Sequence, residues 1–346
     1  MSLIAPALRE RVIADLQIVD QNPAGITQAT SIINQYGMPE DTWAIAPLLA
    51  VLQQMLQRDA ETGYPDQMDL TDQKAFAEAM AYRLSSSAAL EAAYALGVVG
   101  DAQAVPALIA ALNHSDQRVA HHAALALGEI GDPRAIPPLT DAVARSISGA
   151  VEALGMLGAA SASDALLARL RQYTDDSIRS IRAYTTHDLA LIEKLSVTLG
   201  QVGETRAAAP LTTLLGKRNR ELRVYAAIGL SWLGDERARP ALEAALRSND
   251  SILGWPAARR LVQLDDLRGL AAQVRLYQSG DIYDRNSQIR DLSRRGDQWD
   301  LPILRWIRQN DPQLTDFGWT LAEAAERAIT RITARRARHE PPPVQP

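Results

Sequence analysis

Apolar residues recur along this chain in a frame of fourteen positions. In seven windows the second position is leucine, in six of them the sixth is glycine, and in six the fourteenth is leucine. Successive sixth positions lie 31, 27, 45, 31, 31 and 31 residues apart. A repeat of about 20 to 50 residues is typical of a solenoid of stacked units. The windows begin at Ala95, Ala126, Ala153, Thr198, Gly229, Arg260 and Asp291.

Each window predicts the end of one helix and the start of a second. Leu230 and Leu233 are three residues apart and therefore share a helix face. Gly234 follows, and a glycine just past a helix end adopts the left-handed conformation that satisfies the last carbonyls. We expect the next aspartate to cap N–H groups, and a proline to occupy the first turn of the second helix, where no N–H bond is lost. The aspartates are Asp101, Asp132, Asp235 and Asp297, and the prolines are Pro106, Pro137, Pro210, Pro240 and Pro302.

Leucines four residues apart give the second helix its own buried stripe, as at Leu108 and Leu112 or Leu242 and Leu246. Two short helices cannot bury both stripes alone, whereas stacked neighbours can. The sequence therefore predicts an all-α, right-handed α-solenoid of stacked antiparallel helix pairs.

The windows, of which ALGEIGDPRAIPPL is representative, resemble the HEAT-repeat family, and in particular the short HEAT-like repeats of phycobilisome lyases. The resemblance covers about residues 86–310 and implies an armadillo-like helical fold. It indicates little about function, because repeats of this type serve many unrelated roles.

We expect four parts along the chain. Residues 1–85 form a degenerate repeat that caps the array, with Ile33, Gly37 and Ile45 at the frame's offsets and a loop at 58–71. Residues 86–310 form the array, residues 311–334 a capping helix, and residues 335–346 a disordered tail. The 45-residue interval holds 14 residues more than the 31-residue period. We place this insertion near 173–187, either as a loop at a binding face, as a loop without a role in binding, or as extra turns of the flanking helices.

Composition narrows the class of protein. A hydrophobic fraction of 47% is too high for an intrinsically disordered chain. The absence of cysteine excludes a disulfide scaffold, a thiol nucleophile, a zinc ribbon and an iron–sulfur cluster. Charges at Arg9, Glu10 and Arg11 interrupt any signal-peptide apolar region, and no run reaches the ~18 apolar residues of a membrane span. We expect a soluble, cytoplasmic protein with no membrane contact.

Catalytic motifs are missing from the sequence. It contains no GxSxG, no phosphate loop, no GxGxxG and no HExxH. His121 and His122 are adjacent on a predicted helix, about 100° apart, so both cannot face one metal ion. Asp265 stands where other repeats have glycine, and we expect a structural or capping role for it. The sequence thus indicates no metal, no cofactor and no catalytic residue, and it favours a non-enzymatic role while leaving the question of an enzyme open.

Two sets of residues are candidates for binding a partner. One cation per repeat lies roughly opposite the inward leucines of the second helix over five consecutive repeats, which predicts a groove for an acidic surface. An alternative is that these cations interact with helix dipoles, since four of the five lie near a helix C-terminus. The tryptophans near the C-terminus are either interface anchors or packing that seals the array. The cations are Arg145, Arg171, Lys217, Arg247 and Arg275, and the tryptophans are Trp299, Trp306 and Trp319.

Three functions remain open. The favoured one is a non-enzymatic scaffold or adaptor that binds another protein along the solenoid groove. The resemblance implies a second, a bilin lyase or a lyase-related chaperone of phycobiliproteins. The third is a nucleic-acid-binding HEAT-like protein. The formal net charge of −5 for the whole chain argues against it, whereas the net charge of +4 for residues 173–346 leaves it open.

Overall fold

The computed structural model describes residues 6–17, 28–30, 32–33, 41–62, 73–174, 184–247, 251–315 and 318–339. Their contacts divide the chain into two compact units, Met1–Glu204 and Thr205–Pro346. Within the described residues, regular structure is helical throughout, apart from an isolated bridge between Leu314 and Thr320. The predicted all-α fold is therefore confirmed.

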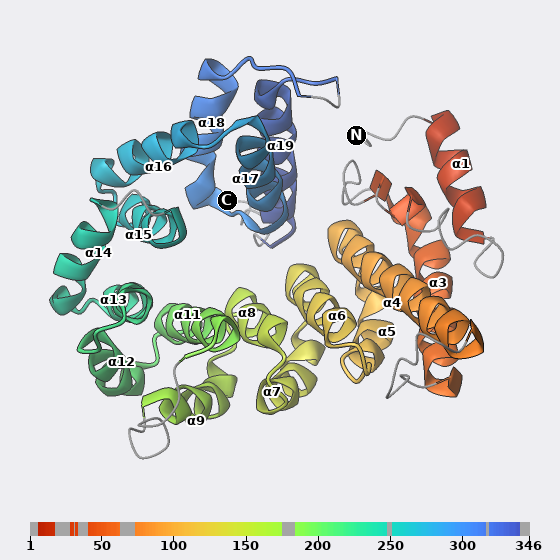
Figure 1. The fold of residues 1–346 in the computed structure, drawn as a ribbon, viewed down its shortest axis with the longest axis horizontal. Coiled ribbons are helices and arrows are strands. Elements are labelled where there is room, and N and C mark those ends of the chain that lie inside the picture. The colour runs from red at the N-terminus through yellow and green to blue at the C-terminus, as the bar shows by residue number, and fades with distance from the viewer. Residues whose placement is uncertain are drawn as a thin grey trace, which may run out of the picture. The chain divides into compact units, whose positions relative to one another are not determined.

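The first unit consists of two layers of helices (Figure 1). The first helices of successive repeats stack directly on one another, α4 on α6, α6 on α8 and α8 on α11, and the second helices form the other layer. The first helices are α4 (Gln73–Val99), α6 (Gln117–Ile130), α8 (Ser148–Met156) and α11 (Thr186–Gln201). The second layer contains α3 (Ile45–Thr62), α5 (Val105–Ala111), α7 (Ile136–Ala144) and α9 (Ser163–Thr174), and α1 (Pro6–Gln17) packs on α3.

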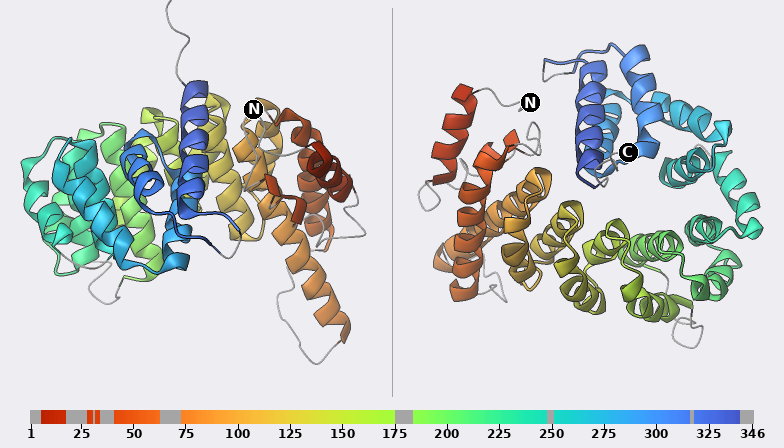
Figure 2. Two further views of the ribbon diagram at one scale, coloured as in Figure 1. Left: turned by 90° about the horizontal axis from the view of Figure 1, so that it is seen from above. Right: turned by 180° about the vertical axis from the view of Figure 1, so that it is seen from behind.

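The second unit continues the same plan (Figure 2). Helix α13 packs on α12 and α14, α15 packs on α14 and α16, and α19 packs on both α17 and α18. The helices are α12 (Ala208–Leu215), α13 (Arg220–Trp232), α14 (Arg239–Leu246), α15 (Ser251–Gln263), α16 (Leu267–Ser279), α17 (Ile282–Arg295), α18 (Leu301–Asn310) and α19 (Leu321–His339). Stacked antiparallel helix pairs are thus the building unit, as the sequence predicts.

The leucine frame forms the core of both units. All seven leucines at the second frame position are less than 9% exposed, from Leu96 to Leu292. The leucines at the fourteenth position are also buried, and Gln273, which replaces one of them, is 0% exposed. The side-chain amide of Gln273 makes no hydrogen bond within the part of the chain that the structure describes. This repeat therefore buries a polar group where the others bury an apolar one.

The turns between paired helices follow the predicted chemistry. Gly100, Gly131, Gly158, Gly203 and Gly234 all have positive φ, and Asp265, which replaces the next glycine, has φ 56°. Aspartate is one of the few residues that tolerates this region. Gly296 is different, because its φ is −67°; a Cβ there would lie 2.3 Å from the carbonyl oxygen of Leu292.

The capping aspartates are confirmed. Their side chains accept hydrogen bonds from the backbone N–H two residues later, as Asp235 does from Arg237. A short 3₁₀ turn that ends on a buried alanine follows three of these caps, at Ala102–Ala104, Pro133–Ala135 and Glu236–Ala238, and the sequence frame did not predict it. Prolines occupy the first two positions of α5, α7, α14 and α18, and Pro210 is the third residue of α12.

Some boundaries differ from the expected ones. Helix α3 continues to Thr62, so residues 58–62 are helical and do not loop out, and α19 continues to His339, beyond the expected boundary at 334. Ile33 and Ile45 are buried, whereas Gly37, residues 63–72 and residues 340–346 lie outside the described residues.

The insertion near 173–187 is held together at its base. Tyr173 is 3% exposed near the end of α9, and its carbonyl accepts a hydrogen bond from the hydroxyl of Tyr184 at 2.9 Å. Thr185 and Asp188 then form a reciprocal capping box at the start of α11. Residues 175–183 lie outside the described residues, so the role of the insertion in binding stays a prediction.

Candidate functional site

A cavity of about 360 Å³ opens in the second unit between α14 and α16. Its lining residues follow helical spacing, so each helix contributes one face. Small side chains at Ala271 and Ala272 leave the space open. We call this cavity the arginine pocket; it is lined by Glu243, Leu246 and Arg247 from α14 and its C-terminal end, and by Arg268, Ala271, Ala272 and Arg275 from α16.

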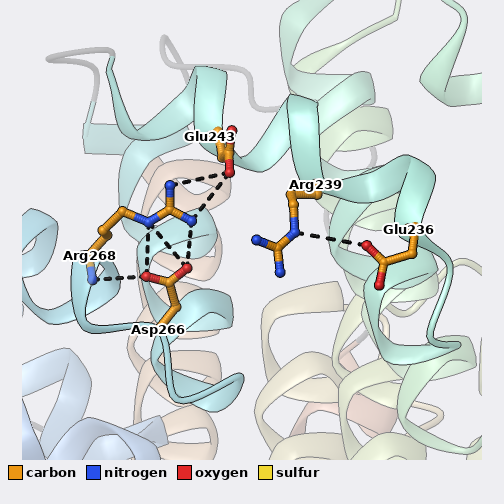
Figure 3. Close-up of polar contacts among 5 residues, drawn as sticks. All are labelled: Glu236, Arg239, Glu243, Asp266 and Arg268. Carbon is orange, nitrogen blue, oxygen red and sulfur yellow. Dashed lines mark hydrogen bonds and ion pairs between the residues drawn. The ribbon is translucent and has the colours of Figure 1, made fainter.

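Arg268 is held by two carboxylates at the edge of the pocket (Figure 3). Asp266 caps α16 by accepting the backbone N–H of Arg268 at 3.0 Å, and it also accepts from Nε and Nη2 of the same side chain at 3.0 and 2.7 Å. Both terminal nitrogens of Arg268 donate to Oε1 of Glu243, each at 3.2 Å. The hydrogen bond from the Arg268 side chain is the main reason that the pKa of Asp266 falls to about 2.

Arg275 binds the end of the neighbouring helix. Its Nη2 donates to the carbonyl oxygen of Leu246, the last residue of α14. Arg145 does the same in the first unit, where its Nη1 donates to the carbonyl oxygen of Leu112 at 3.1 Å, just past α5. The last carbonyls of a helix lack partners within the helix and carry partial negative charge. These two arginines therefore act on the C-terminus of the preceding second helix.

Arg247 and Arg171 differ from these two arginines. Both side chains are exposed, and neither makes an ion pair or a hydrogen bond with the residues that the structure describes. Lys217 is half-buried just past the end of α12. Of the five predicted cations, the structure brings Arg247 and Arg275 together in one pocket. Arg145 and Arg171 belong to the other unit, and their joint role in a groove stays a prediction.

Arg268 was not among the predicted cations, although a sequence signal marks it. The spacing Asp-x-Arg also occurs at Asp116, Asp132 and Asp235, and each time the aspartate caps a helical turn and binds the arginine side chain two residues later. Because the spacing recurs, it is visible without the structure. The additional bond to Glu243 of the preceding repeat is not visible in this way.

The three C-terminal tryptophans are half-buried. Trp306 packs against the cluster around Tyr277 and Ile303, and its ring meets that of Tyr277 edge to face, with centroids 6.3 Å apart. The guanidinium of Arg327 lies 4.9 Å from the ring centroid of Trp319. Trp299 lies in the turn that Asp297 caps. For Trp306 these contacts support the sealing role; an interface role for the set stays a prediction.

Two of the histidines, His114 and His121, contact neighbouring polar groups. Nδ1 of His114 accepts the backbone N–H of Asp116 at 2.9 Å, and Nδ1 of His121 lies 3.1 Å from Oγ of Ser148. Among the described side chains, no group of three or more potential ligands is arranged to hold a metal ion. None of the helices in the described ranges combines the length and the apolar character needed to cross a membrane.

The two units have formal net charges of opposite sign. Residues 205–346 contain 23 Lys and Arg against 17 Asp and Glu, a net charge of +6. Residues 1–204 contain 13 against 24, a net charge of −11. The arginine pocket therefore lies in the unit whose overall charge attracts anions.

Comparison with known proteins identifies the repeats. A family model of HEAT repeats matches residues 74–148 and 196–261, so these two segments are HEAT repeats, as the sequence windows suggested. Among solved structures, the chain is similar to one in the complex of CpcE and CpcF of phycocyanin lyase from Nostoc sp. PCC7120, with 18% identity over 94% of each chain and a TM-score of 0.42. An engineered protein is similar with 16% identity, a TM-score of 0.30, and coverage of 94% of this chain and 95% of the other. TM-scores this low support no conclusion about function. No curated protein matches the sequence.

Proposed function

We propose that this HEAT-repeat chain is a protein-binding scaffold that holds an acidic segment of a partner protein in the arginine pocket. The observation that supports the proposal is Arg247. This residue lines a cavity of about 360 Å³ and is exposed, and its side chain makes no hydrogen bond or ion pair with the described residues.

The chemistry of the pocket suits a carboxylate side chain. A guanidinium presents its N–H groups in a planar fork that matches a carboxylate. Leu246, Ala271 and Ala272 provide an apolar wall for the methylene groups that carry such a carboxylate. The net charge of +6 on this unit increases the rate at which an acidic partner meets it.

Substitution of Arg247 tests the proposal. We expect Arg247→Glu to weaken the binding of a fluorescent ten-residue peptide of alternating glutamate and leucine by about tenfold, measured by anisotropy, because an attraction becomes a repulsion. The fold is expected to survive, since this side chain holds no other described residue in place.

Arg171→Glu is the matched control, because Arg171 is also exposed and also makes no side-chain bond with described residues, but lies in the first unit. It is expected to leave peptide binding unchanged. Equal losses in the two variants would show that net charge alone attracts the peptide and would contradict a site at the pocket.

Nucleic acid is the competing ligand, because the positive charge of residues 205–346 favours any polyanion. The same anisotropy measurement with a 20-base-pair DNA duplex separates the two. The proposal predicts that DNA binds more weakly than the peptide at physiological salt. Tighter DNA binding with a steep salt dependence, lost in Arg247→Glu, would assign the pocket to phosphate contacts instead.

A further inference from the structure

One carboxylate of the chain itself already lies in the wall of the arginine pocket. Glu243 is about one-third exposed and accepts hydrogen bonds from both terminal nitrogens of Arg268. Figure 3 shows Arg268 between this carboxylate and that of Asp266. The guanidinium of Arg268 is therefore already bonded to two carboxylates before any ligand anion enters the pocket.

The charged groups around the pocket have a small positive net charge. Three arginines line the pocket, Arg247, Arg268 and Arg275, and Arg268 is bonded to two carboxylates, that of Glu243 in the lining and that of Asp266 beside it; these five side chains have a formal net charge of +1. Arg275 also donates to the carbonyl oxygen that ends α14, where the helix dipole is negative. The pocket thus neutralises about one negative charge of a ligand.

We infer that Glu243 sets the charge selectivity of the pocket, so that it accepts the single carboxylate of an acidic peptide and disfavours the phosphate of a phosphopeptide. This inference rests on the proposed function and names the ligand group. A phosphoserine carries about −1.5 to −2 at neutral pH, so part of its charge stays uncompensated beside Glu243. The single negative charge of a glutamate side chain balances the net charge of +1, and its two oxygens accept hydrogen bonds from the guanidinium of Arg247.

The chain offers a matched residue against which Glu243 can be tested. Glu236 also carries one negative charge near an arginine of the same helix pair, 3.9 Å from Nε of Arg239, but its side chain is 90% exposed and does not line the pocket (Figure 3). Neutralising Glu236 changes the net charge of the unit by the same amount. The two variants therefore differ in where the charge is removed and in the hydrogen bonds from Arg268, which only Glu243 accepts.

The experiment compares two ten-residue peptides that differ only in a central glutamate or phosphoserine. Wild type is expected to bind the glutamate peptide more tightly. Glu243→Gln is expected to improve the affinity for the phosphoserine peptide by about tenfold and that for the glutamate peptide by about threefold, because the removed repulsion scales with ligand charge. Glu236→Gln is expected to change both affinities by less than about twofold, because an exposed charge is screened. Glu243→Asp keeps the charge and is expected to keep the preference for glutamate.

Other outcomes overturn the inference in distinguishable ways. If wild type prefers the phosphoserine peptide, or if Glu243→Gln and Glu236→Gln have the same effect, Glu243 does not set selectivity, while the proposed function stands. If neither peptide binds to wild type or to Glu243→Gln, both the inference and the proposed function are wrong. Circular dichroism of each variant confirms that the helices are intact.

Discussion

At the scale of single residues, the exceptions to the repeat frame are the most informative positions. Asp265 replaces glycine and takes the same left-handed conformation, with φ 56°. Gln273 replaces leucine and is as fully buried as the leucines, yet its amide has no hydrogen-bond partner among the described residues. The first exception preserves the backbone of the repeat, whereas the second introduces a desolvated polar group into its core.

We expect Gln273→Leu to stabilise the protein by about 1 to 3 kcal/mol, because a buried polar group without a partner costs this much relative to an apolar side chain. The urea denaturation midpoint measures the change. Leu304→Gln is the reverse substitution at the same frame position in the next repeat and is expected to destabilise. A lower midpoint for Gln273→Leu would show that something in solution satisfies the amide.

At the scale of elements, arginines connect two of the helix pairs to the pair before them. Arg145 and Arg275 donate to carbonyls at the end of the preceding second helix, and Arg260 does so among the first helices, where its Nη2 donates to the carbonyl oxygen of Ser231 at 3.0 Å. Arg260 is 5% exposed, its guanidinium stacks over Trp232, and burial lowers its pKa to about 10. Two of the five predicted cations, Arg145 and Arg275, thus donate to carbonyls at the end of a neighbouring helix.

The turns that join paired helices are expected to weaken in acid. The arginine side chain two residues later lowers the pKa of both Asp235 and Asp266 to about 2, below the value of about 3.9 for an unfolded chain. Their contribution to stability is therefore fully present above about pH 4 and is lost as the pH falls towards 2. Urea midpoints between pH 5 and pH 2 measure the loss. Asp266→Asn is expected to lose less stability than wild type over this range, and an identical pH dependence would contradict the assignment.

At the scale of the whole molecule, each of the two units is a stack in which helix pairs contact their neighbours. Stability in such an array is approximately a sum of local terms. In each repeat, the local contribution to stability depends on the buried leucines of the frame. Leu199 and Leu230 are two of them, and both are 0% exposed. Damage at one repeat is therefore expected to spread only to adjacent repeats.

We expect Leu230→Ala to cost roughly 2 to 5 kcal/mol locally. Hydrogen exchange is expected to accelerate most in α13 and α14, less elsewhere in residues 205–346, and least in residues 1–204. Leu267→Ala is the control, because this leucine is 86% exposed and its removal leaves no cavity. Uniform acceleration over the whole chain would contradict a stack of semi-independent repeats.

The sequence by itself determined the repeat, its two helices and the turn between them. These features depend on local rules: leucines at helical spacing mark a buried face, and only glycine, or Asp265 in its place, fits the left-handed turn. The sequence also placed cations on the second helices and capping aspartates before them. Apart from the 31-residue period itself, each of these inferences concerns residues within about one turn of each other.

The tertiary structure alone decided which partner each cation meets. Arg275 and the carbonyl of Leu246 are 29 residues apart, and Arg268 and Glu243 are 25 residues apart. Periodicity gives the face of a helix on which a side chain lies, but the opposing group depends on the distance and rotation between stacked repeats. In the arginine pocket, Arg275 meets the carbonyl oxygen of Leu246, whereas the side chain of Arg247 makes no bond with the described residues, although both arginines come from the same predicted set.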